Sequence, residues 1–173
     1  METHMENNKM LYSHVSVDCV LLGVNEDKLC VLLIERQMDN SDEKRYKLPG
    51  SLIFENEDLD TAAHRVFNEA TGLKRVPLKQ FRSFGSPSRT KNKDDMQWLE
   101  NAMKLKIERI VTVAYLALSK IGRKSNPTNK YNSLAWFPVD ALPSLPFDHK
   151  EIIEAAVEEI REWVEKEPSI IFD

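Results

Sequence analysis

The chain has 173 residues, of which 42% are hydrophobic and 30% are charged, a composition typical of one globular domain and not of a disordered segment. Its formal net charge is −4 and no run of Lys or Arg exceeds two residues, which argues against nucleic-acid binding by bulk electrostatics. The apolar runs are too short to cross a bilayer and Met1–Lys9 lacks the apolar segment of a signal peptide, so we expect a cytoplasmic protein with no membrane partner.

The first third of the chain predicts a β-hairpin after a flexible leader. We expect residues 1–12 to be the leader and residues 13–166 to form one domain. Two β-branched, apolar segments flank the polar sequence Asn25-Glu26-Asp27, which is typical of two strands joined by a tight turn. The predicted elements are the strands His14–Val24 and Lys28–Glu35, the loop Gln37–Arg45, and two short extended pieces around a Pro-Gly break, Tyr46–Gly50 and Ser51–Phe54.

Leu59–Thr71 has the clearest helical pattern in the sequence. Its apolar residues recur at spacings of three and four, which predicts a helix with one buried face. Asp58 and Asp60 lie at its start, where the positive end of the helix dipole stabilises carboxylates. Gly72 follows directly and is a typical helix stop.

The rest of the chain predicts three more strands and two more helices. Asp148 is the candidate N-cap of the last helix, and Glu151 follows three residues later, as in a capping box. The predicted elements are the strands Pro77–Phe84, Ile107–Leu118 and Ser133–Phe137, the helices Asp94–Leu105 and Asp148–Lys166, the loop Gly122–Lys130, and a tail over residues 167–173. The order of strands and helices indicates an α+β protein with an α/β/α sandwich, and not a doubly wound parallel sheet.

Two cysteines, Cys19 and Cys30, lie within the apolar runs of the predicted hairpin. We interpret them as small buried hydrophobic residues of a protein in a reducing compartment, with a disulfide as the less favoured alternative. The spacing of Cys and His residues does not suggest a zinc site.

The stretch Leu48–Leu73 (LPGSLIFENEDLDTAAHRVFNEATGL) combines an extended segment, an acidic turn and a helix that ends at a glycine. It resembles the signature of the Nudix family: Gly, five residues, Glu, seven residues, then Arg-Glu-apolar-x-Glu-Glu-x-Gly-apolar. The positions that match the signature are Glu57, Arg65, Phe67, Glu69, Gly72 and Leu73, and those that depart from it are Ser51, Val66 and Ala70. The resemblance implies the Nudix fold, which is a mixed β-sheet flanked by helices.

The departures bear directly on function. In the family, three helix carboxylates hold a divalent metal that activates water to attack a pyrophosphate, and here Val66, Glu69 and Ala70 occupy those places. Because Mg²⁺ requires oxygen ligands, two aliphatic residues weaken such a site. If the chain is active, the resemblance implies Glu69, Glu57 and Arg65 as catalytic residues, with Glu69 and Glu57 as weak ligands of Mg²⁺; otherwise we expect no cofactor. The alternatives are an ordinary surface pair between Arg65 and Glu69, and a solvated turn carboxylate at Glu57.

The resemblance continues beyond this motif. Phe84-Gly85 with Arg89 downstream, Glu108–Tyr115, and Phe147-Asp148-His149 are similar to segments of the Nudix-like sensor domains in bacterial transcriptional regulators of NAD metabolism and sugar use, the NrtR and AraR type. In those domains the hydrolase helix is commonly degenerate, and the ligand is ADP-ribose or a related sugar. The resemblance also implies a homodimer.

Three arginines are the candidate ligand-binding residues, because a guanidinium offers a bidentate fork to phosphate or to sugar hydroxyls: Arg89, Arg109 and Arg36. Arg109 lies in a predicted apolar strand and therefore needs a partner, either the ligand or an acidic residue of the protein. Arg36 either reaches the same cleft or is a solvated loop residue. Trp98 and Met103 either pack their segment onto the core, cover the ligand or contribute to a dimer contact.

Two functional hypotheses follow, with a third that assigns no ligand. The first is a sensor that binds a nucleotide sugar or a sugar, ADP-ribose-like or a pentose, without efficient hydrolysis. The alternative is a divergent Mg²⁺-dependent Nudix hydrolase of nucleoside diphosphate derivatives, and the third is an interaction domain with a vestigial site. The related regulators bind DNA through a C-terminal winged-helix module that we do not find in these 173 residues, so we expect either a free-standing sensor or a fragment of a longer regulator.

Overall fold

The computed structural model describes residues 11–36, 38, 43–120 and 133–171. The predicted leader residues 1–10, the predicted loop 122–130 and part of the predicted loop 37–45 lie outside the described residues. The elements are β1 (Leu11–Asn25), β2 (Lys28–Arg36), β3 (Arg45–Lys47), β4 (Gly50–Phe54), α1 (Leu59–Thr71), β5 (Lys79–Phe84), the 3₁₀ turn η1 (Pro87–Thr90), α2 (Lys93–Met103), β6 (Val111–Lys120), β7 (Leu134–Pro138), α3 (His149–Lys166) and the 3₁₀ turn η2 (Pro168–Ile171). Among the described helices, none has the length and apolar character needed to span a bilayer.

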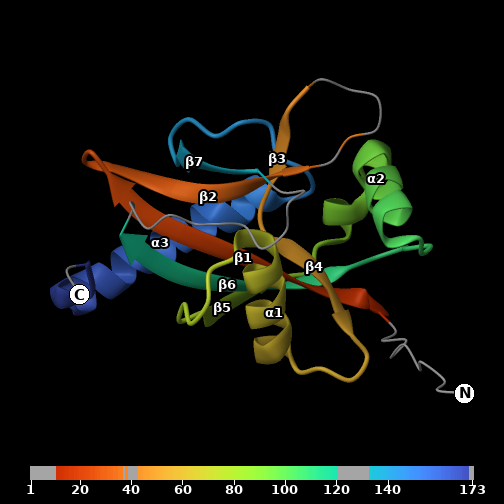
Figure 1. Ribbon diagram of the computed structural model, residues 1–173, viewed down its shortest axis with the longest axis horizontal. Coiled ribbons are helices and arrows are strands. Elements are labelled where there is room, and N and C mark those ends of the chain that lie inside the picture. The colour runs from red at the N-terminus through yellow and green to blue at the C-terminus, as the bar shows by residue number, and fades with distance from the viewer. Residues whose placement is uncertain (1–10, 37, 39–42, 121–132, 172–173) are drawn as a thin grey trace, which may run out of the picture.

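The described strands form one seven-stranded sheet that lies between α1 and α3 (Figure 1). The strand order is β3-β2-β1-β6-β5, with β4 pairing along β1 and β7 along β2. β1 and β6 run parallel, whereas the other described pairs are antiparallel. The predicted α+β class, with a mixed sheet between helices, is confirmed.

The predicted hairpin is formed by β1 and β2. Asn25 pairs with Lys28, so the loop contains two residues. Both of these residues, Glu26 and Asp27, have positive φ angles of 46° and 66°. Positive φ at both central positions defines the type I′ turn, whose twist matches that of the adjoining strands.

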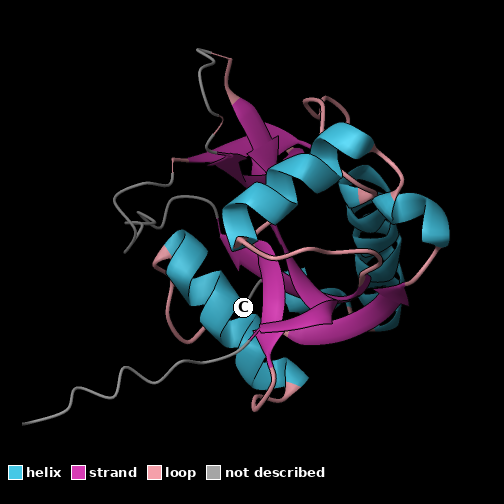
Figure 2. Ribbon diagram, turned by 90° about the vertical axis from the view of Figure 1, so that its right-hand side faces the viewer, coloured by secondary structure: helices cyan, strands magenta, loops and turns pink. Residues whose placement is uncertain are grey.

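The side chains of β1 alternate between two cores, because successive residues of a strand point to opposite faces. Val17, Cys19 and Leu21 pack with α1, whereas Val20 and Leu22 pack with α3. Figure 2 shows helices on both sides of the strands. Cys19 and Cys30 are buried and free, as predicted, and burial raises the pKa of each thiol.

The helix α1 has the bounds predicted from the sequence. The Asp58 carboxylate accepts a hydrogen bond from the Thr61 amide at 2.8 Å, which caps the first turn. Gly72 ends the helix at φ 72°, where its amide donates to the Asn68 carbonyl. The left-handed conformation at this position favours glycine because glycine has no Cβ.

Most predicted element ends differ from the structure by one or two residues, whereas the starts of β1 and β6 differ by more. β1 begins at Leu11, inside the predicted leader, because Leu11 pairs with Phe54 of β4. β6 begins at Val111 and not at Ile107, because the residues before it form an irregular segment. In that segment Ile107 and Ile110 are buried against Leu52 of β4 and against side chains of α2.

Asp148 stands at the N-cap position of α3, but the predicted capping box is not formed. Its side chain makes no capping hydrogen bond, and Glu151 is exposed. The Asp148 carboxylate instead accepts two hydrogen bonds from Arg89. The Asp148 carboxylate binds Arg89 and not the helix amides, because a charge-assisted bidentate pair is stronger than a hydrogen bond to a backbone amide.

We expect Gly50→Ala to destabilise the fold by about 1–3 kcal/mol or more. A Cβ at Gly50 would lie 2.0 Å from Asp18 Oδ1 and 2.9 Å from the Val17 carbonyl oxygen, and Asp18 is buried. Denaturant unfolding measures the loss. Gly85→Ala is the matched control, because its Cβ would meet only Val111 methyl groups, at 3.5 and 3.6 Å. Equal stability of the two variants would contradict the close approach of Gly50 to Asp18.

Candidate ligand-binding site

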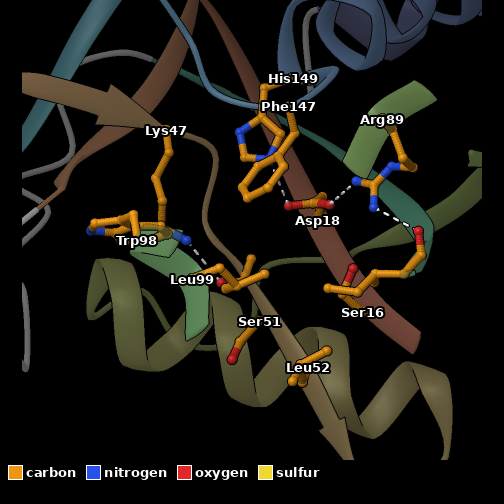
Figure 3. Close-up of a pocket in the computed structure, with 12 residues that line it drawn as sticks. Ser16, Asp18, Lys47, Ser51, Leu52, Arg89, Trp98, Leu99, Phe147 and His149 are labelled. Atoms are coloured by element: carbon orange, nitrogen blue, oxygen red, sulfur yellow. Dashed lines mark hydrogen bonds and ion pairs between the residues drawn. The ribbon is translucent and has the colours of Figure 1, made fainter. Parts of the chain in front are cut away.

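A small cavity lies on the α3 side of the sheet, where β1, β4, α2 and the first turn of α3 meet (Figure 3). Its volume is about 40 Å³, which is room for one or two water molecules. Charged and polar side chains line two parts of it. One part contains Asp18, Arg89 and His149, and the other contains Lys47 and Trp98.

Asp18 is a carboxylate in the middle of the central strand, and it is 4% exposed. The Thr112 hydroxyl of β6 donates to its Oδ2 at 2.6 Å. His149 Nε2 lies 3.4 Å from Oδ1, and Arg89 Nη2 lies 3.8 Å from Oδ2. The burial of this charge is tolerated because three partners from separate segments surround it.

Arg89 is held entirely by the protein. Its Nε and Nη2 donate to the two oxygens of Asp148, each at 3.1 Å, and its Nη1 donates to the Ile110 carbonyl at 2.9 Å. Every guanidinium nitrogen therefore has a partner. The structure places this sequence-predicted ligand residue at the cavity, in a buried network that ties η1 to the start of α3.

His149 is buried, and its two ring nitrogens have different partners. The Leu48 amide donates to Nδ1 at 3.2 Å, which assigns the proton of the neutral ring to Nε2, the nitrogen that faces Asp18. Burial lowers the pKa of His149 to about 4, against the opposing effect of Asp18. The ring is therefore neutral at pH 7.

Two cations contact Trp98, whose ring lines the second part of the cavity together with Lys47. The Arg36 guanidinium lies 4.9 Å from the centre of the Trp98 ring, and Lys47 Nζ lies 5.7 Å from it. Lys47 donates to the Gly50 carbonyl at 2.9 Å. Burial lowers the pKa of both basic groups. The structure shows Trp98 at the cavity, in contact with these two cations.

On the opposite face, Glu57 and Arg65 form a hydrogen-bonded pair within the signature motif. Arg65 Nε donates to Glu57 Oε2 at 3.0 Å, and Arg65 Nη2 donates to the Leu52 carbonyl at 3.3 Å. Glu57 Oε1 accepts from the Phe54 amide at 2.9 Å. The pair joins the turn after β4 to α1, so Glu57 is not a solvated turn carboxylate.

The three places where the family has metal ligands differ in their exposure. Val66 and Ala70 are buried, with 4% and 7% of their surface exposed. The Glu69 side chain is 65% exposed, and its Oε2 lies 3.5 Å from Arg65 Nη1. Within the described part of the chain, no three His, Cys, Asp or Glu residues are grouped so that they could hold a metal ion. With Glu57 bound to Arg65, this donor set does not fit a Mg²⁺ site built on α1.

The structure separates the six predicted site residues. Glu57, Arg65 and Glu69 lie together at α1, Arg89 lies at the cavity, and Arg36 lies at the end of β2 beneath Trp98. Arg109 is exposed, in the segment before β6, and it donates to the Gly85 carbonyl at 2.8 Å. Its partner is therefore a backbone oxygen and not a buried acid.

Sequence reasoning missed Asp18 and Lys47, which line the cavity, and Thr112, which donates to Asp18. A signal for Asp18 was present, since an acidic residue between Val17 and Cys19 in an apolar strand must find partners when it is buried. Thr112 and Lys47 carried no comparable signal. Hydroxyl and amine groups at such positions are common on exposed strand faces.

Comparison with known protein families identifies the family of this chain. The NUDIX domain family matches residues 12–158. The chain belongs to the Nudix family. A MutT/nudix family protein from Enterococcus faecalis has a similar structure, with a TM-score of 0.69 and 26% identity, and the match covers 92% of this chain and 66% of that one.

Two further proteins are similar to this chain, one in sequence and one in structure. The ADPR responsive transcriptional repressor NtrR of Acinetobacter baylyi is 29% identical over 82% of this chain. The crystal structure of Shewanella oneidensis NrtR matches with a TM-score of 0.65 and 25% identity, covering 86% of this chain and 64% of that one. The chain spans about half the length of the Acinetobacter repressor, 52%.

We expect Arg89→Met to destabilise this Nudix domain by about 3–5 kcal/mol, because it removes the cation that pairs with the buried Asp18 and the half-buried Asp148. Thermal or denaturant unfolding measures the effect. Arg109→Met is the matched control: Arg109 is exposed and its contact is one bond to a carbonyl, so the expected change is within about 0.5 kcal/mol. Similar losses in the two variants would contradict the assigned network.

The free energy of unfolding is expected to fall as the pH decreases from about 6.5 to about 4. The folded state holds His149 with a pKa of about 4, whereas the unfolded chain binds the proton near the ordinary value of 6.5. The contribution of neutral His149 to the free energy of unfolding is therefore fully present above pH 6.5. It is lost as the pH falls from about 6.5 to about 4. Unfolding measured across pH 4–8 should show a smaller slope for His149→Gln.

His64→Gln is the control for the pH experiment, because His64 is exposed on α1. It should leave the pH profile unchanged. A wild-type slope retained in His149→Gln would show that other groups cause the acid sensitivity.

Proposed function

We propose that this Nudix domain is a ligand sensor that binds a nucleotide sugar or a sugar, ADP-ribose-like or a pentose, without efficient hydrolysis. The observation that carries the proposal is the burial of Val66 and Ala70 in α1, at the places where the family has metal-binding carboxylates. A buried aliphatic side chain supplies no oxygen to a cation. The name of the Acinetobacter repressor, which is ADPR responsive, supports the same class of ligand.

The cavity by the Asp18 cluster is the proposed ligand site. Its volume of about 40 Å³ is far below the several hundred Å³ of typical small-molecule pockets. A sugar ligand therefore requires α2 or the neighbouring loops to move outward. α2 suits such a motion because it has no fully buried residue.

The wider setting follows from the relatives and is part of the proposal. We infer a bacterial, cytoplasmic homodimer that acts in transcriptional regulation. DNA binding would come only through a module outside these 173 residues. The support is the name of the Acinetobacter protein, a transcriptional repressor, together with the free, buried cysteines.

A divergent hydrolase of nucleoside diphosphate derivatives is the second candidate. One observation favours it: the Glu57–Arg65 pair is intact, and Glu69 is exposed to solvent beside it. Hydrolysis would require Mg²⁺ and a carboxylate from another segment. The catalytic residues would then be Glu69, Glu57 and Arg65.

Binding without turnover is the expected result when the chain is incubated with Mg²⁺ or Mn²⁺ and a panel of nucleoside diphosphate derivatives and pentoses. Saturating ligand should stabilise the fold, by about 2.7 kcal/mol at one hundred times its dissociation constant. Thermal-shift and product analyses measure the two effects.

Metal-dependent product release that is lost in Glu69→Gln would contradict the sensor function and establish the hydrolase. Glu158→Gln is the matched control, because Glu158 is an exposed carboxylate on α3, away from α1. Stabilisation by none of the compounds would leave the domain as an interaction module with a vestigial site.

A further inference from the structure

Phe147, in the turn before α3, has a strained backbone conformation. Its φ is 51°, in the left-handed region that large side chains rarely adopt and that turns fill with glycine, asparagine or aspartate. The turn is closed by the His149 amide, which donates to the Pro146 carbonyl at 3.2 Å. A conformation of this kind persists where surrounding groups hold it in place.

Asp95, in the first turn of α2, holds the Phe147 backbone. Its Oδ2 accepts from the Phe147 amide at 2.9 Å, across 52 residues of sequence. The Asp95 side chain is 16% exposed, so this bond is largely shielded from water, and its other oxygen lies 3.6 Å from Arg36 Nη1. A carboxylate in such surroundings is a strong acceptor. One side chain therefore joins α2 to the turn before α3.

The other attachments of α2 are weaker. The helix has no fully buried residue, and Met96, Leu99 and Met103 pack on the core from partly buried positions. The chain is fixed on both sides of it, because Arg89 is buried before the helix and Ile107 after it. The helix is thus a peripheral segment between two fixed points, with the Asp95 bond as its shielded polar attachment.

Phe147 lines both the small cavity and a larger surface cleft. The cavity, of about 40 Å³, also contacts Trp98 and Leu99 of α2. The cleft, of about 610 Å³, follows residues 139–151. Figure 3 shows the Phe147 ring beside the His149 ring, and the two ring centres are 5.7 Å apart. Phe147 therefore forms part of the wall between the cavity and the cleft.

We propose that the bond between Asp95 and the Phe147 amide is a latch that keeps α2 closed over the cavity, and that its release opens the cavity into the cleft. With the amide free, Phe147 returns to an ordinary negative φ and its ring leaves the shared wall. The opened site has the several hundred Å³ of a typical small-molecule pocket. This inference rests on the proposed sensor function and adds the step by which its closed site admits a ligand.

A latch of this kind lowers the affinity for ligand, because only molecules with the latch released are able to bind. It also connects the ligand site to α3. Asp148 and His149 directly follow Phe147, and they contact Arg89 and Asp18 respectively. A ligand that keeps the latch open therefore changes the start of α3.

Hydrogen exchange of the Phe147 amide, followed by NMR on the full chain without ligand, tests the latch. Asp95→Ala should speed this exchange by about tenfold to a hundredfold, because it removes a hydrogen bond to a charged acceptor. Asp95→Asn keeps a carbonyl acceptor without the charge, so it should speed exchange by about fivefold. It also covers the case in which the alanine variant does not fold. Asp94→Ala is the matched control, because Asp94 is the exposed acid beside Asp95 in the same helix turn, and its exchange should equal that of the wild type.

Calorimetry with ADP-ribose and with arabinose measures the effect of the latch on binding. Asp95→Ala should bind the compound that the wild type binds about tenfold more tightly, because a larger fraction of the protein is already open. Removal of a ligand contact, or of a purely structural bond, would weaken binding or leave it unchanged. Asp94→Ala should bind like the wild type.

Unchanged exchange at Phe147 in both Asp95 variants, or binding that is not tightened in Asp95→Ala, would overturn the latch and leave the sensor function in place. Metal-dependent cleavage of ADP-ribose would overturn the sensor function, and a lower KM of Asp95→Ala would then support the latch. If neither compound binds, the sensor function fails, and the exchange rates at Phe147 decide the latch by themselves.

Discussion

One buried carboxylate organises this end of the domain. Asp18 lies in the central strand β1, and its charge requires partners that the strand itself cannot supply. Thr112 comes from the parallel neighbour β6, Arg89 from η1, and His149 from the first turn of α3. Position 50 of β4 requires glycine for the same reason, because a Cβ at Gly50 would occupy the space of the Asp18 carboxylate. Segments up to 131 residues apart thereby meet at one point, and their meeting creates the cavity.

Two parts of the Nudix motif have different physical roles in this structure. Glu57 and Arg65 bind each other and the backbone of β4, so they stabilise the turn before α1 with or without a metal. Val66 and Ala70 belong to the buried face of the same helix. Buried aliphatic side chains at such places add to the apolar core. The packing of α1 on the sheet therefore does not require carboxylates at these two positions.

The helix α2 borders the cavity and is held by apolar and polar contacts. Met96, Leu99 and Met103 pack on Leu52 and Ile110, but the helix has no fully buried residue. Asp95 reaches both Phe147 and Arg36. Trp98 covers two cations. A segment attached in this way opens at a lower free-energy cost than a buried apolar core, because few buried apolar contacts hold it.

Local patterns in the sequence were sufficient for the elements and for the family. The spacing of apolar residues predicted α1 to its exact ends in Leu59 and Thr71, and the turn at Glu26 and Asp27 predicted the hairpin, because these features depend on neighbours along the chain. The sequence also identified the altered motif on α1. The tertiary structure alone decided the partners of the charged residues. Asp148 binds Arg89 and does not cap the helix, and Arg109 lies outside the strand. Asp18 is buried at the cavity. The physical reason is that a buried charge is stabilised by groups distant in sequence, and which groups arrive there depends on how the sheet brings its strands and helices together.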